Sequence, residues 1–536
     1  MKQQAKLAAP YAFPSSAPGG KSMQAAQASP AIGYNNWGRI WKWTSKTYKG
    51  QFTLQASALL VLALLLALLS SQAVSRASED LDTIGNDSIP SVDAAQAMAQ
   101  YVEDIDAKAA DYLAAVGLTE LQPCVVPGPN TAVISLTVHA CDDHTIDAEI
   151  QLFNQELYKA AHNVTYPGER TAIERITAGF EEYTSHIAVM RSEFTQATNT
   201  ENTHDPHMLK AWQAYVAASN VLHSKIAWQP PVNAQGHVVF NESNVPSCLL
   251  KGQSAPATTW VQGSIEDILT CFGDINKSHL DAAYNDTSSF LDGSRALLFA
   301  LCVLFCVLLL LCSLRLAGVT HRVVNIGLTP AFLVSIFLSF SVISLFNGMA
   351  GRHGAYGQMV KDDYDSVYYA AQLKRSGTMA NADESRWLVS LRFGDQEQTT
   401  RWANDWKQNV VEVQSLLARA RNNRTWKEED QPLTDMQHNW STYYTIDARI
   451  RDAAGNGSDQ QQILQAEHIS TGESNQTFSK FLDAVDRLSQ ANRAHYQETF
   501  AGIHSTLAIS LLLYSLLYPL VGLAAAWGIA RRFKDF

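Results

Sequence analysis

The sequence is poor in charged residues and in the short motifs that mark known chemistries. Asp, Glu, Lys and Arg make up only 17% of its 536 residues, and four long apolar runs contain none of them. The chain has no G-x-S-x-G or H-E-x-x-H motif, no phosphate-binding P-loop and no kinase or dinucleotide fingerprint. These absences argue against the motif-defined hydrolases, metalloproteases, kinases and nucleotide-binding enzymes. We therefore expect a protein that is not an enzyme, carries no cofactor and binds no nucleic acid.

The four apolar runs are residues 52–74, 296–314, 323–346 and 506–529. Each has roughly the 20 residues that a helix needs to cross about 30 Å of hydrocarbon. The first run lies too deep in the chain to be a cleaved signal peptide. All four are predicted to be transmembrane helices, so the lipid bilayer is an expected partner. Because no run carries a charge at its centre, no ion or proton path is indicated, and a transporter or channel subunit is a remote alternative.

The basic residues beside the apolar runs predict the orientation of the chain in a membrane. Residues 1–51 hold seven of them and no acid, the turn 315–322 holds two and no acid, and the tail 530–536 holds three. Positively charged flanks stay in the cytoplasm. That leaves 28 of the 40 Lys and Arg, and 50 of the 51 Asp and Glu, on the other side. We expect a plasma-membrane protein with both termini in the cytoplasm and two large extracytoplasmic loops, residues 75–295 and 347–505.

The N-terminal region 1–51 is expected to be a disordered basic tail, because it is rich in Ala, Gln, Ser, Pro and Gly and shows no periodicity. Its end mixes Trp37, Trp41 and Trp43 with basic residues. Such a mixture is typical of a segment at the level of the lipid headgroups. We therefore expect an interfacial aromatic segment just before the first span, with docking of a protein as the alternative.

Four of the seven cysteines lie in the first outer loop and form two pairs that are close in sequence. Cys124 and Cys141 flank one short loop, and Cys248 and Cys271 flank another. Of the three possible pairings we favour these two local ones, since an oxidising compartment supports disulfides. Each would close a loop of roughly 15–25 residues, worth about 3 kcal/mol in the chain-entropy model. Free buried thiols are the alternative.

Both outer regions carry apolar residues at helical spacing. In the first region, one series alternates steps of three and four and predicts a helix covered by a partner: Ile173, Ile176, Phe180, Tyr183, Ile187, Met190 and Phe194. Asp205 before Pro206 predicts the start of the next helix, and the stretch 228–262 predicts a cap loop. The second region has four apolar stripes, which four antiparallel helices would bury. The predicted fold is an all-α integral membrane protein with four transmembrane helices and two extracytoplasmic antiparallel helical bundles.

The two outer regions echo each other and resemble a known kind of sensor. Residues 91–117 and 366–394 share Ser-Val, then Ala-Ala-Gln, then an aromatic-Leu pair before a glycine, which predicts a duplicated unit. The stretch "DSIPSVDAAQAMAQYVEDIDAKAADYLAA" resembles the first helix of the four-helix-bundle sensor domain of bacterial chemoreceptors and sensor kinases. The resemblance implies ligand sensing outside the cell by a homodimer or higher oligomer. It also implies a signal that passes along continuous helices into the membrane.

Two groups of side chains are candidate sites. His139, Asp142, Asp143 and His144, with His204 and His207, contain metal-ligand types, but helix capping and a solvated loop are the favoured interpretation. Aromatic residues of the second region could line a pocket for a small apolar or cationic ligand, although their helical spacing favours core packing. The candidate pocket residues are Tyr368, Tyr369, Trp387, Trp402, Trp406, Trp440 and Tyr444.

The leading hypothesis is a membrane-anchored extracytoplasmic sensor that passes signals to a separate protein. Chemoreceptors and kinases continue into a cytoplasmic output domain, and this sequence ends a few residues after its last apolar run. A signalling or envelope partner protein is therefore expected, of a kind that the sequence does not name. The alternative is a structural scaffold of the cell envelope that presents its bundles for assembly and binds no ligand.

Overall fold

The structure is a computed structural model. It describes residues 47–116, 118–119, 121–127, 132–224, 226–228, 260–322, 324–455, 457 and 459–532. Most of the expected tail 1–51, most of the predicted cap loop and the last four residues of the chain lie outside this part.

The first half of the chain opens with a helix of 67 residues that joins the first apolar run to the polar region. α2 (Tyr48–Asp82) passes through a π-helical turn, η1 (Thr83–Ser88), into α3 (Ile89–Ala114). The Leu- and Ala-rich composition of α2 favours helix throughout. No loop therefore separates the predicted span from the polar region that follows it.

Among its described residues, the rest of the first half contains three shorter helices, one long helix and two antiparallel strand pairs. The helices are α4 (Val138–His162), α5 (Glu169–Gln196), α6 (Pro206–His223) and α7 (Ile265–Thr320), and the strand pairs are β1 (Gln122–Val126) with β2 (Ala132–Leu136) and β3 (Ile226–Trp228) with β4 (Trp260–Gly263). The predicted start of α6 is confirmed, because the Asp205 side chain accepts a hydrogen bond from His207 N and Pro206 is the first helical residue. The hairpins were not predicted.

The second half follows the same order of long and short helices. It contains α8 (Leu328–Met349), α9 (Ala355–Gly357), η3 (Gln358–Tyr364), α10 (Asp365–Arg392), α11 (Gln396–Asn422), η4 (Lys427–Glu429), α12 (Asp430–Ala454), α13 (Gln460–Ile469), η5 (Ser470–Ser474) and α14 (Asn475–Ala530). The last three join into one helix of 71 residues. The second half thus also begins and ends in an apolar helix, α8 and α14. Unlike α2, however, α8 is separated by a short break from the helices that follow it.

The turn between the halves lies later than the expected 315–322. α7 continues to Thr320, with Gly318 inside the helix, and α8 begins at Leu328. The turn is therefore residues 321–327. At its end, a Cβ added to Gly327 would lie 2.5 Å from the Cα of Gly528 on α14, so only glycine permits this approach.

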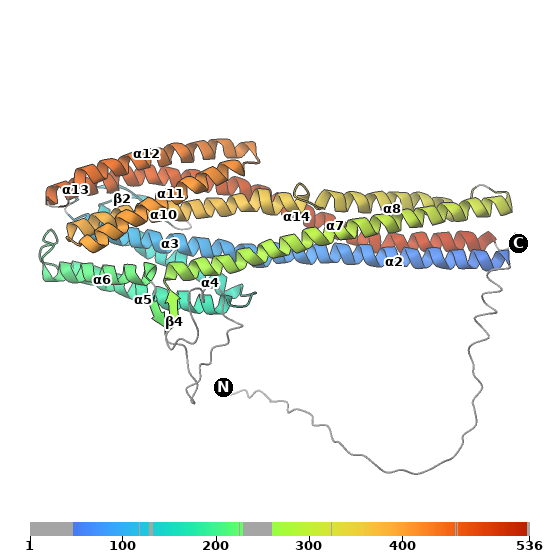
Figure 1. Cartoon of the computed structure of the whole chain (residues 1–536), viewed down its shortest axis with the longest axis horizontal. Coiled ribbons are helices and arrows are strands. Elements are labelled where there is room, and N and C mark those ends of the chain that lie inside the picture. The colour runs from blue at the N-terminus through green and yellow to red at the C-terminus, as the bar shows by residue number, and fades with distance from the viewer. Residues whose placement is uncertain are drawn as a thin grey trace, which may run out of the picture.

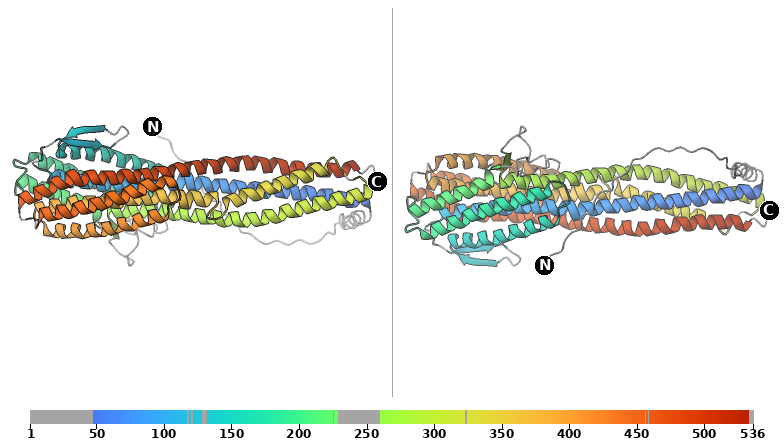
Figure 2. Two further views of the ribbon diagram at one scale, coloured as in Figure 1. Left: turned by 90° about the horizontal axis from the view of Figure 1, so that it is seen from above. Right: turned by 90° about the horizontal axis from the view of Figure 1, so that it is seen from below.

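The molecule is a long rod with a narrow end and a thick end. Figure 1 shows α2, α7, α8 and α14 forming the narrow end, where the start of α2, the α7–α8 turn and the end of α14 lie together. Figure 2 shows the same long helices from above and below, with the remaining helices gathered at the other end. Among the described residues, four helices are long and apolar enough to cross a membrane. This confirms the all-α class and agrees with the four predicted spans.

The buried core follows the predicted apolar stripes. All seven residues of the predicted α5 series are at most 8% exposed, and they pack with α3, α6 and α7. The aromatic and aliphatic stripe of α11 is buried in the same way against α10, α12 and α14. α3 of the first half packs along α10 of the second, so the two bundles share one long contact.

One turn occurs in both halves. In the first half it is bonded to the start of α3, and in the second half to the start of α10. In the first half, Asn163 Nδ2 donates to the Asp87 carbonyl (2.6 Å) and to Ser91 Oγ (2.8 Å). Glu169 Oε2 accepts from the backbone N–H groups of Thr165 and Tyr166 (2.6 and 2.7 Å). The sequence "NVTYPGE" therefore folds into a capped turn in which the asparagine side chain is already engaged.

The second half repeats this turn with the sequence "NRTWKEE". Asn423 Nδ2 donates to Ser366 Oγ (2.8 Å), and Glu429 Oε2 accepts from Thr425 N and Trp426 N (2.6 and 2.8 Å). A histidine of the returning helix stacks on the turn's aromatic ring in both halves, at 4.0 Å for Tyr166–His279 and 4.1 Å for Trp426–His495. Ser91 and Ser366, and His279 and His495, are therefore equivalent positions.

Candidate functional site

A group of buried charged side chains lies where α3 packs along α10. α3 contributes Glu103 and Asp106, and α10 contributes Asp383 and Arg386; all four residues are at most 1% exposed. Residues three apart lie on one face of a helix, so each pair faces the opposite helix as a unit. The two halves of the chain therefore meet through buried charged groups at this contact.

Arg386 is bound by three carboxylates. Its Nη2 lies 2.7 Å from Glu103 Oε2, its Nε 2.7 Å from Asp106 Oδ2, and its Nη1 2.8 Å from Asp383 Oδ1. Charge-assisted hydrogen bonds of this length are strong and directional. Because burial removes water from every partner, the loss of one partner leaves an uncompensated charge in the interior.

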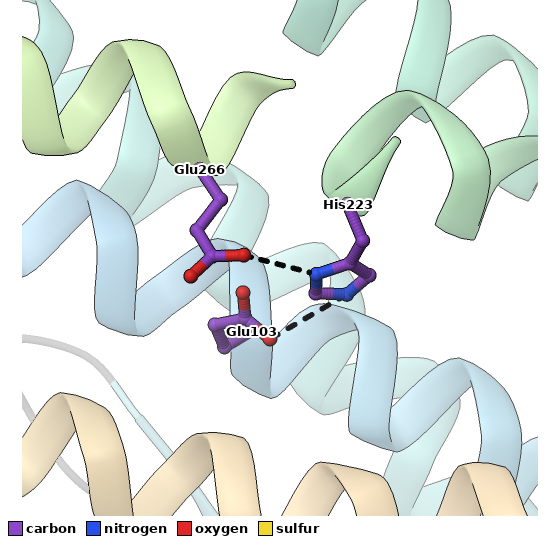
Figure 3. A group of neighbouring side chains, drawn as sticks. All are labelled: Glu103, His223 and Glu266. Atoms are coloured by element: carbon purple, nitrogen blue, oxygen red, sulfur yellow. Dashed lines mark hydrogen bonds and ion pairs between the residues drawn. The ribbon is translucent and has the colours of Figure 1, made fainter. Parts of the chain in front are cut away.

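His223 and Glu266 extend this group at the end of α6 and the start of α7. His223 Nδ1 lies 3.3 Å from Glu266 Oε2, while its Nε2 lies 3.8 Å from Glu103 Oε2 and 3.9 Å from Asp106 Oδ2. Figure 3 shows the imidazole between Glu103 and Glu266, with each ring nitrogen turned to a different carboxylate. We call the following six residues the ionic cluster: Glu103, Asp106, His223, Glu266, Asp383 and Arg386.

Further polar and aromatic side chains enclose the ionic cluster. Tyr183 and Tyr215 donate from their hydroxyls to Asp106, each at 3.2 Å. The ring of Trp402 lies 4.9 Å from the Arg386 guanidinium and edge-on to the His223 ring at 5.3 Å. These groups come from α5, α6 and α11. The cluster therefore ties together helices of both halves rather than only α3 and α10.

Burial and charge oppose each other in the ionic cluster. Burial alone would raise the pKa of Asp106, but Arg386 and His223 outweigh it and lower that pKa to about 2. Burial would lower the pKa of His223, but the carboxylates of Glu103, Asp106 and Glu266 together outweigh it and raise that pKa to about 9. Burial raises the pKa of Asp383 to about 7, although Arg386 opposes the rise. At neutral pH His223 therefore carries its proton, and Asp383 is the group nearest to titration.

Three members of the cluster hold metal-ligand atoms close to one another. Glu103, His223 and Glu266 each offer one such atom within 4.8 Å of the others. A metal needs a deprotonated ring nitrogen, whereas both nitrogens of His223 face carboxylates. Both carboxylates also pair with guanidinium groups, Glu103 with Arg386 at 2.7 Å and Glu266 with Arg375 at 3.3 Å. This set of donors fits an ion-pair network around a protonated histidine better than it fits a divalent cation.

The structure brings together only part of the predicted aromatic pocket. Trp387 and Trp406 hold the Arg451 guanidinium between them, at 4.6 and 4.4 Å from the ring centres. Trp406 also stacks on Tyr444 at 5.7 Å. Trp440 is 2% exposed and lies in the core of the second bundle. Except for Tyr444, which is exposed, these rings are buried against one another and against one cation, and a ligand pocket at these residues stays a prediction.

Tyr368 and Tyr369 lie far from the other predicted pocket residues. They precede Trp387 on α10 by a length of helix of roughly 28 Å, at about 1.5 Å per residue. Lys277 lies over the Tyr368 ring at 5.5 Å, and the Tyr369 ring is 6.1 Å from it. The two tyrosines therefore belong to a different part of the contact between the halves.

The predicted disulfide between Cys124 and Cys141 is present. It joins the first hairpin to the start of α4. Cys271 on α7 is also disulfide-bonded, whereas Cys248, the partner expected for it, lies outside the described residues.

The sequence cluster of His and Asp residues is dispersed among structural contacts. His139 stacks with Tyr112 at 3.7 Å, and His207 Nδ1 pairs with Glu193 at 2.8 Å. Asp142 is 2% exposed and lies 3.7 Å from Lys108, so the predicted solvated environment is wrong for this carboxylate. It begins neither a loop nor a helix, since α4 starts four residues earlier.

Sequence reasoning did not find the ionic cluster. The one available signal was that Glu103 and Asp106 fall beside Val102 and Ile105, inside the apolar stripe of their helix. Comparison of the chain with protein-family models, with curated proteins and with solved structures found no match. The function is therefore argued from the architecture and from the cluster alone.

Proposed function

We propose that this protein is a membrane-anchored extracytoplasmic sensor that passes conformational changes through its spans to a partner protein. The observation that carries the proposal is the continuity of three helices along the rod. The helix from Tyr48 to Ala114 has 67 residues, α7 has 56, and the helix from Gln460 to Ala530 has 71. At about 1.5 Å per residue these helices are roughly 80–110 Å long.

Continuous helices couple the two ends of the molecule mechanically. A shift of a packed helix by 1–2 Å is a common switching movement, and an uninterrupted helix carries it without loss in a loop. π-helical turns at η1 and η3 lie between the apolar and polar parts of the outgoing helices. Such turns are local changes of helical winding that often accompany function. They give α3 and α10 a place to rotate relative to α2 and α8.

In this proposal the ionic cluster is the part of the molecule that switches between two discrete arrangements. Arg386 satisfies carboxylates on both halves in one register of α3 against α10, and a shift by one helical turn would break these bonds. If the contact were purely apolar, α3 could slide along α10 with a smaller change in free energy. A buried charge network therefore favours discrete states over continuous sliding, which is a requirement for a switch.

Charge supports the proposed orientation. Five described basic residues lie at or near the ends of α2, α7 and α14 that form the narrow end of the rod, while the stretches 47–78, 293–361 and 499–532 contain no acid. These basic residues are Lys49, Arg315, Arg322, Arg531 and Arg532. We place this end in the cytoplasm and both bundles outside. A partner protein would read the narrow end, and the homodimer or higher oligomer implied by the resemblance remains part of the proposal.

The orientation is tested with single cysteines and a maleimide that does not cross membranes. Asp405→Cys on α11 is expected to react in intact cells, and Arg322→Cys only after lysis. Reaction of the first variant only after lysis would place the bundles in the cytoplasm and refute the proposal.

Transmission is tested with spin labels at lipid-facing positions near the narrow end. Leu54 on α2 and Leu333 on α8 are 54% and 62% exposed. In full-length protein in nanodiscs, with the three free cysteines replaced by alanine, Arg386→Met is expected to change the distance between these labels by about 2 Å. Arg449→Met is the control, because Arg449 pairs with Glu473 at the surface.

The same experiment distinguishes the scaffold alternative. Hydrogen exchange of α3 shows independently whether Arg386→Met loosens the contact between the halves. If α3 exchanges faster while the label distance stays unchanged, the helices do not transmit. A structural scaffold of the cell envelope would then be the better explanation of this architecture.

A further inference from the structure

Two carboxyl groups meet inside the second bundle, beside the π-helical turn η5. Glu384 on α10 is 0% exposed, Asp447 on α12 is 1% exposed, and a side-chain hydrogen bond joins them. Ionised carboxylates can only accept hydrogen bonds. A hydrogen bond between two carboxyl groups therefore needs a proton on one of them, and the contact itself points to a bound proton.

One cation accompanies the two carboxyl groups. Arg451 donates from Nε and Nη2 to the two carboxylate oxygens of Asp447, at 2.8 and 3.0 Å. Its guanidinium lies between the rings of Trp387 and Trp406. If both carboxyl groups were ionised, the three charges would leave one negative charge uncompensated in the interior, which is costly. With one proton bound, the three groups are neutral together.

Two further titratable side chains face this pair, and neither supplies a counter-charge. Burial and the carboxylates of Glu384 and Asp447 raise the pKa of Tyr443 on α12 well above its ordinary range. Burial, Asp111 and Glu384 raise the pKa of Glu467 on α13, although a nearby guanidinium on α10 opposes the rise. Both side chains are therefore uncharged at neutral pH.

The environment assigns the shared proton to Glu384. Burial and the Asp447 carboxylate raise the pKa of Glu384 to about 8, although Ser470 and Arg451 oppose the rise. Burial also raises the pKa of Asp447, but Arg451 and the hydrogen bond with Glu384 oppose it. The two carboxyl groups titrate as one unit. At neutral pH Glu384 therefore holds the proton, while Asp447 keeps the negative charge that pairs with Arg451.

The same carboxyl group of Glu384 fastens both ends of η5. Ser470 Oγ donates to Glu384 Oε1 at 2.7 Å, and Ser474 Oγ donates to Glu384 Oε2 at 3.3 Å. These serines are the first and last residues of η5, and both are 0% exposed. π-helical turns are rare and often mark functional places. This turn lies within the helix of 71 residues that ends at Ala530.

We propose that Glu384 and Asp447 share one proton and that this proton keeps η5 in its place. Without the proton the two carboxylates repel each other, and Glu384 moves away from Asp447 together with the serines bonded to it. Binding of the proton does not depend on the function proposed above. Only its consequence rests on that function: because α14 continues from η5 to the narrow end, the acidity of the outer medium would be a signal that this protein senses.

The shared proton is tested by infrared spectroscopy of the full chain in nanodiscs at about pH 6, above the ordinary range of glutamate. The difference between the wild type and Glu384→Gln is expected to show one carbonyl band of a buried, protonated carboxyl group. Glu473→Gln is the matched control, because Glu473 lies on the same turn but pairs with Arg449 at the surface. Its difference spectrum is expected to lack this band. Absence of the band for Glu384→Gln, or an equal band for the control, would overturn the proposal.

The pH dependence of unfolding gives a second measurement. The folded state keeps the Glu384 proton up to about pH 8, whereas an unfolded glutamate releases it near pH 4.3. Between about pH 5 and pH 7 this proton is expected to raise the unfolding equilibrium constant about tenfold per pH unit. Glu384→Gln keeps a donor and an acceptor and is expected to lose this tenfold slope, while Glu473→Gln keeps it. Equal slopes in the wild type and Glu384→Gln would contradict a shared proton.

Hydrogen exchange at about pH 6 and pH 9, corrected for the intrinsic rates, tests the effect on η5. In the wild type the amides from Ser470 into the first turn of α14 are expected to exchange about tenfold faster at the higher pH, where Glu384 is mostly ionised. In Glu384→Gln they are expected to exchange equally at both. Unchanged exchange in the wild type would refute the link between the proton and η5. None of these measurements uses the label distance between α2 and α8, so this proposal and the proposed function fail separately.

Discussion

The two halves of the chain share their architecture but carry opposite charges where they meet. Seventeen and twenty residues after Ser91, α3 has Lys108 and Asp111; at the same distances after Ser366, α10 has Asp383 and Arg386. The order of signs is reversed. The position of Asp111 is therefore taken by a cation in α10, and this cation binds the Glu103 and Asp106 carboxylates of α3.

The reversed residues also have different partners. Lys108 lies 3.5 Å from Asp111 and 3.7 Å from Asp142, both in its own half. Arg386 instead reaches across the contact to Glu103 and Asp106. One half therefore uses its charges to hold its own bundle together, and the other uses them to hold the two bundles together. The halves are adapted to each other rather than to copies of themselves.

The largest expected effect is the loss of the bridging arginine. Arg386→Met leaves Glu103, Asp106 and Asp383 without their main cation, and breaking a buried pair costs about 3–5 kcal/mol. We expect a loss of about 4 kcal/mol in the free energy of unfolding, measured with denaturant in detergent. Arg449→Met, at a surface pair, should cost at most about 0.5 kcal/mol. Equal small effects would show that the halves do not depend on this bridge.

The second largest effect is expected in the first half alone, because the disulfide between Cys124 and Cys141 lies in that half. Cys124 and Cys141 are 17 residues apart and close a loop around the first hairpin. Replacing both by serine is expected to cost about 3 kcal/mol. Hydrogen exchange should increase in α4 and hardly change in α11 and α12. An increase spread equally over both bundles would mean that the halves unfold as one unit.

Local sequence predicted the helices well because their stripes are local. The α5 series from Ile173 to Phe194 and the helix start at Asp205 and Pro206 were both expected and both occur. The π-helical turns were not expected, since "TIGNDS" and "QMVKDDY" show no pattern that separates them from an α-helix. The hairpins were missed because they lie among turn residues close to the cysteines.

The ionic cluster could not be predicted from one sequence. Glu103 and Arg386 are separated by 283 residues, and within its own helix Arg386 reads as a surface residue. Its burial depends on α3 covering α10, which no local pattern reveals. The aromatic spacing predicted core packing for Trp402 correctly, but it gave no sign that this ring would lie against a buried guanidinium.

The third prediction concerns the turn that both halves share. Asn163→Ala removes hydrogen bonds to the start of α3, and Asn423→Ala removes those to the start of α10. Each is expected to cost about 1–2 kcal/mol. Both asparagines stand in Asn-x-Thr triplets, and in both the side-chain amide donates these hydrogen bonds. Costs that differ by more than about 1 kcal/mol would show that the two turns are not equivalent in strength.

The smallest expected effect on stability comes from the one hydrogen bond in which the two turns differ. In the first half Ser88 Oγ and Tyr166 OH share a hydrogen bond of 2.6 Å. At the equivalent place in the second half, Trp426 Nε1 donates to Asp363 Oδ1 at 2.8 Å. Burial raises the pKa of Asp363 to about 6, although Trp426 and the nearby His495 oppose the rise. A neutral pair is thus replaced by a group that titrates in a mildly acidic medium.

The direction of the resulting pH dependence follows from the raised pKa. The folded state holds the Asp363 proton up to about pH 6, whereas an unfolded aspartate releases it near pH 3.9. Stability from this group is therefore present at low pH and is lost as the pH rises from about 4 to 6, by about 1 kcal/mol after solvent screening. Asp363→Asn should remove this difference from the pH profile of unfolding, and Ser88→Asn should leave the profile unchanged. An identical slope in the wild type and in Asp363→Asn would assign the titration to another carboxyl group, and the two turns would then differ in sequence without differing in behaviour.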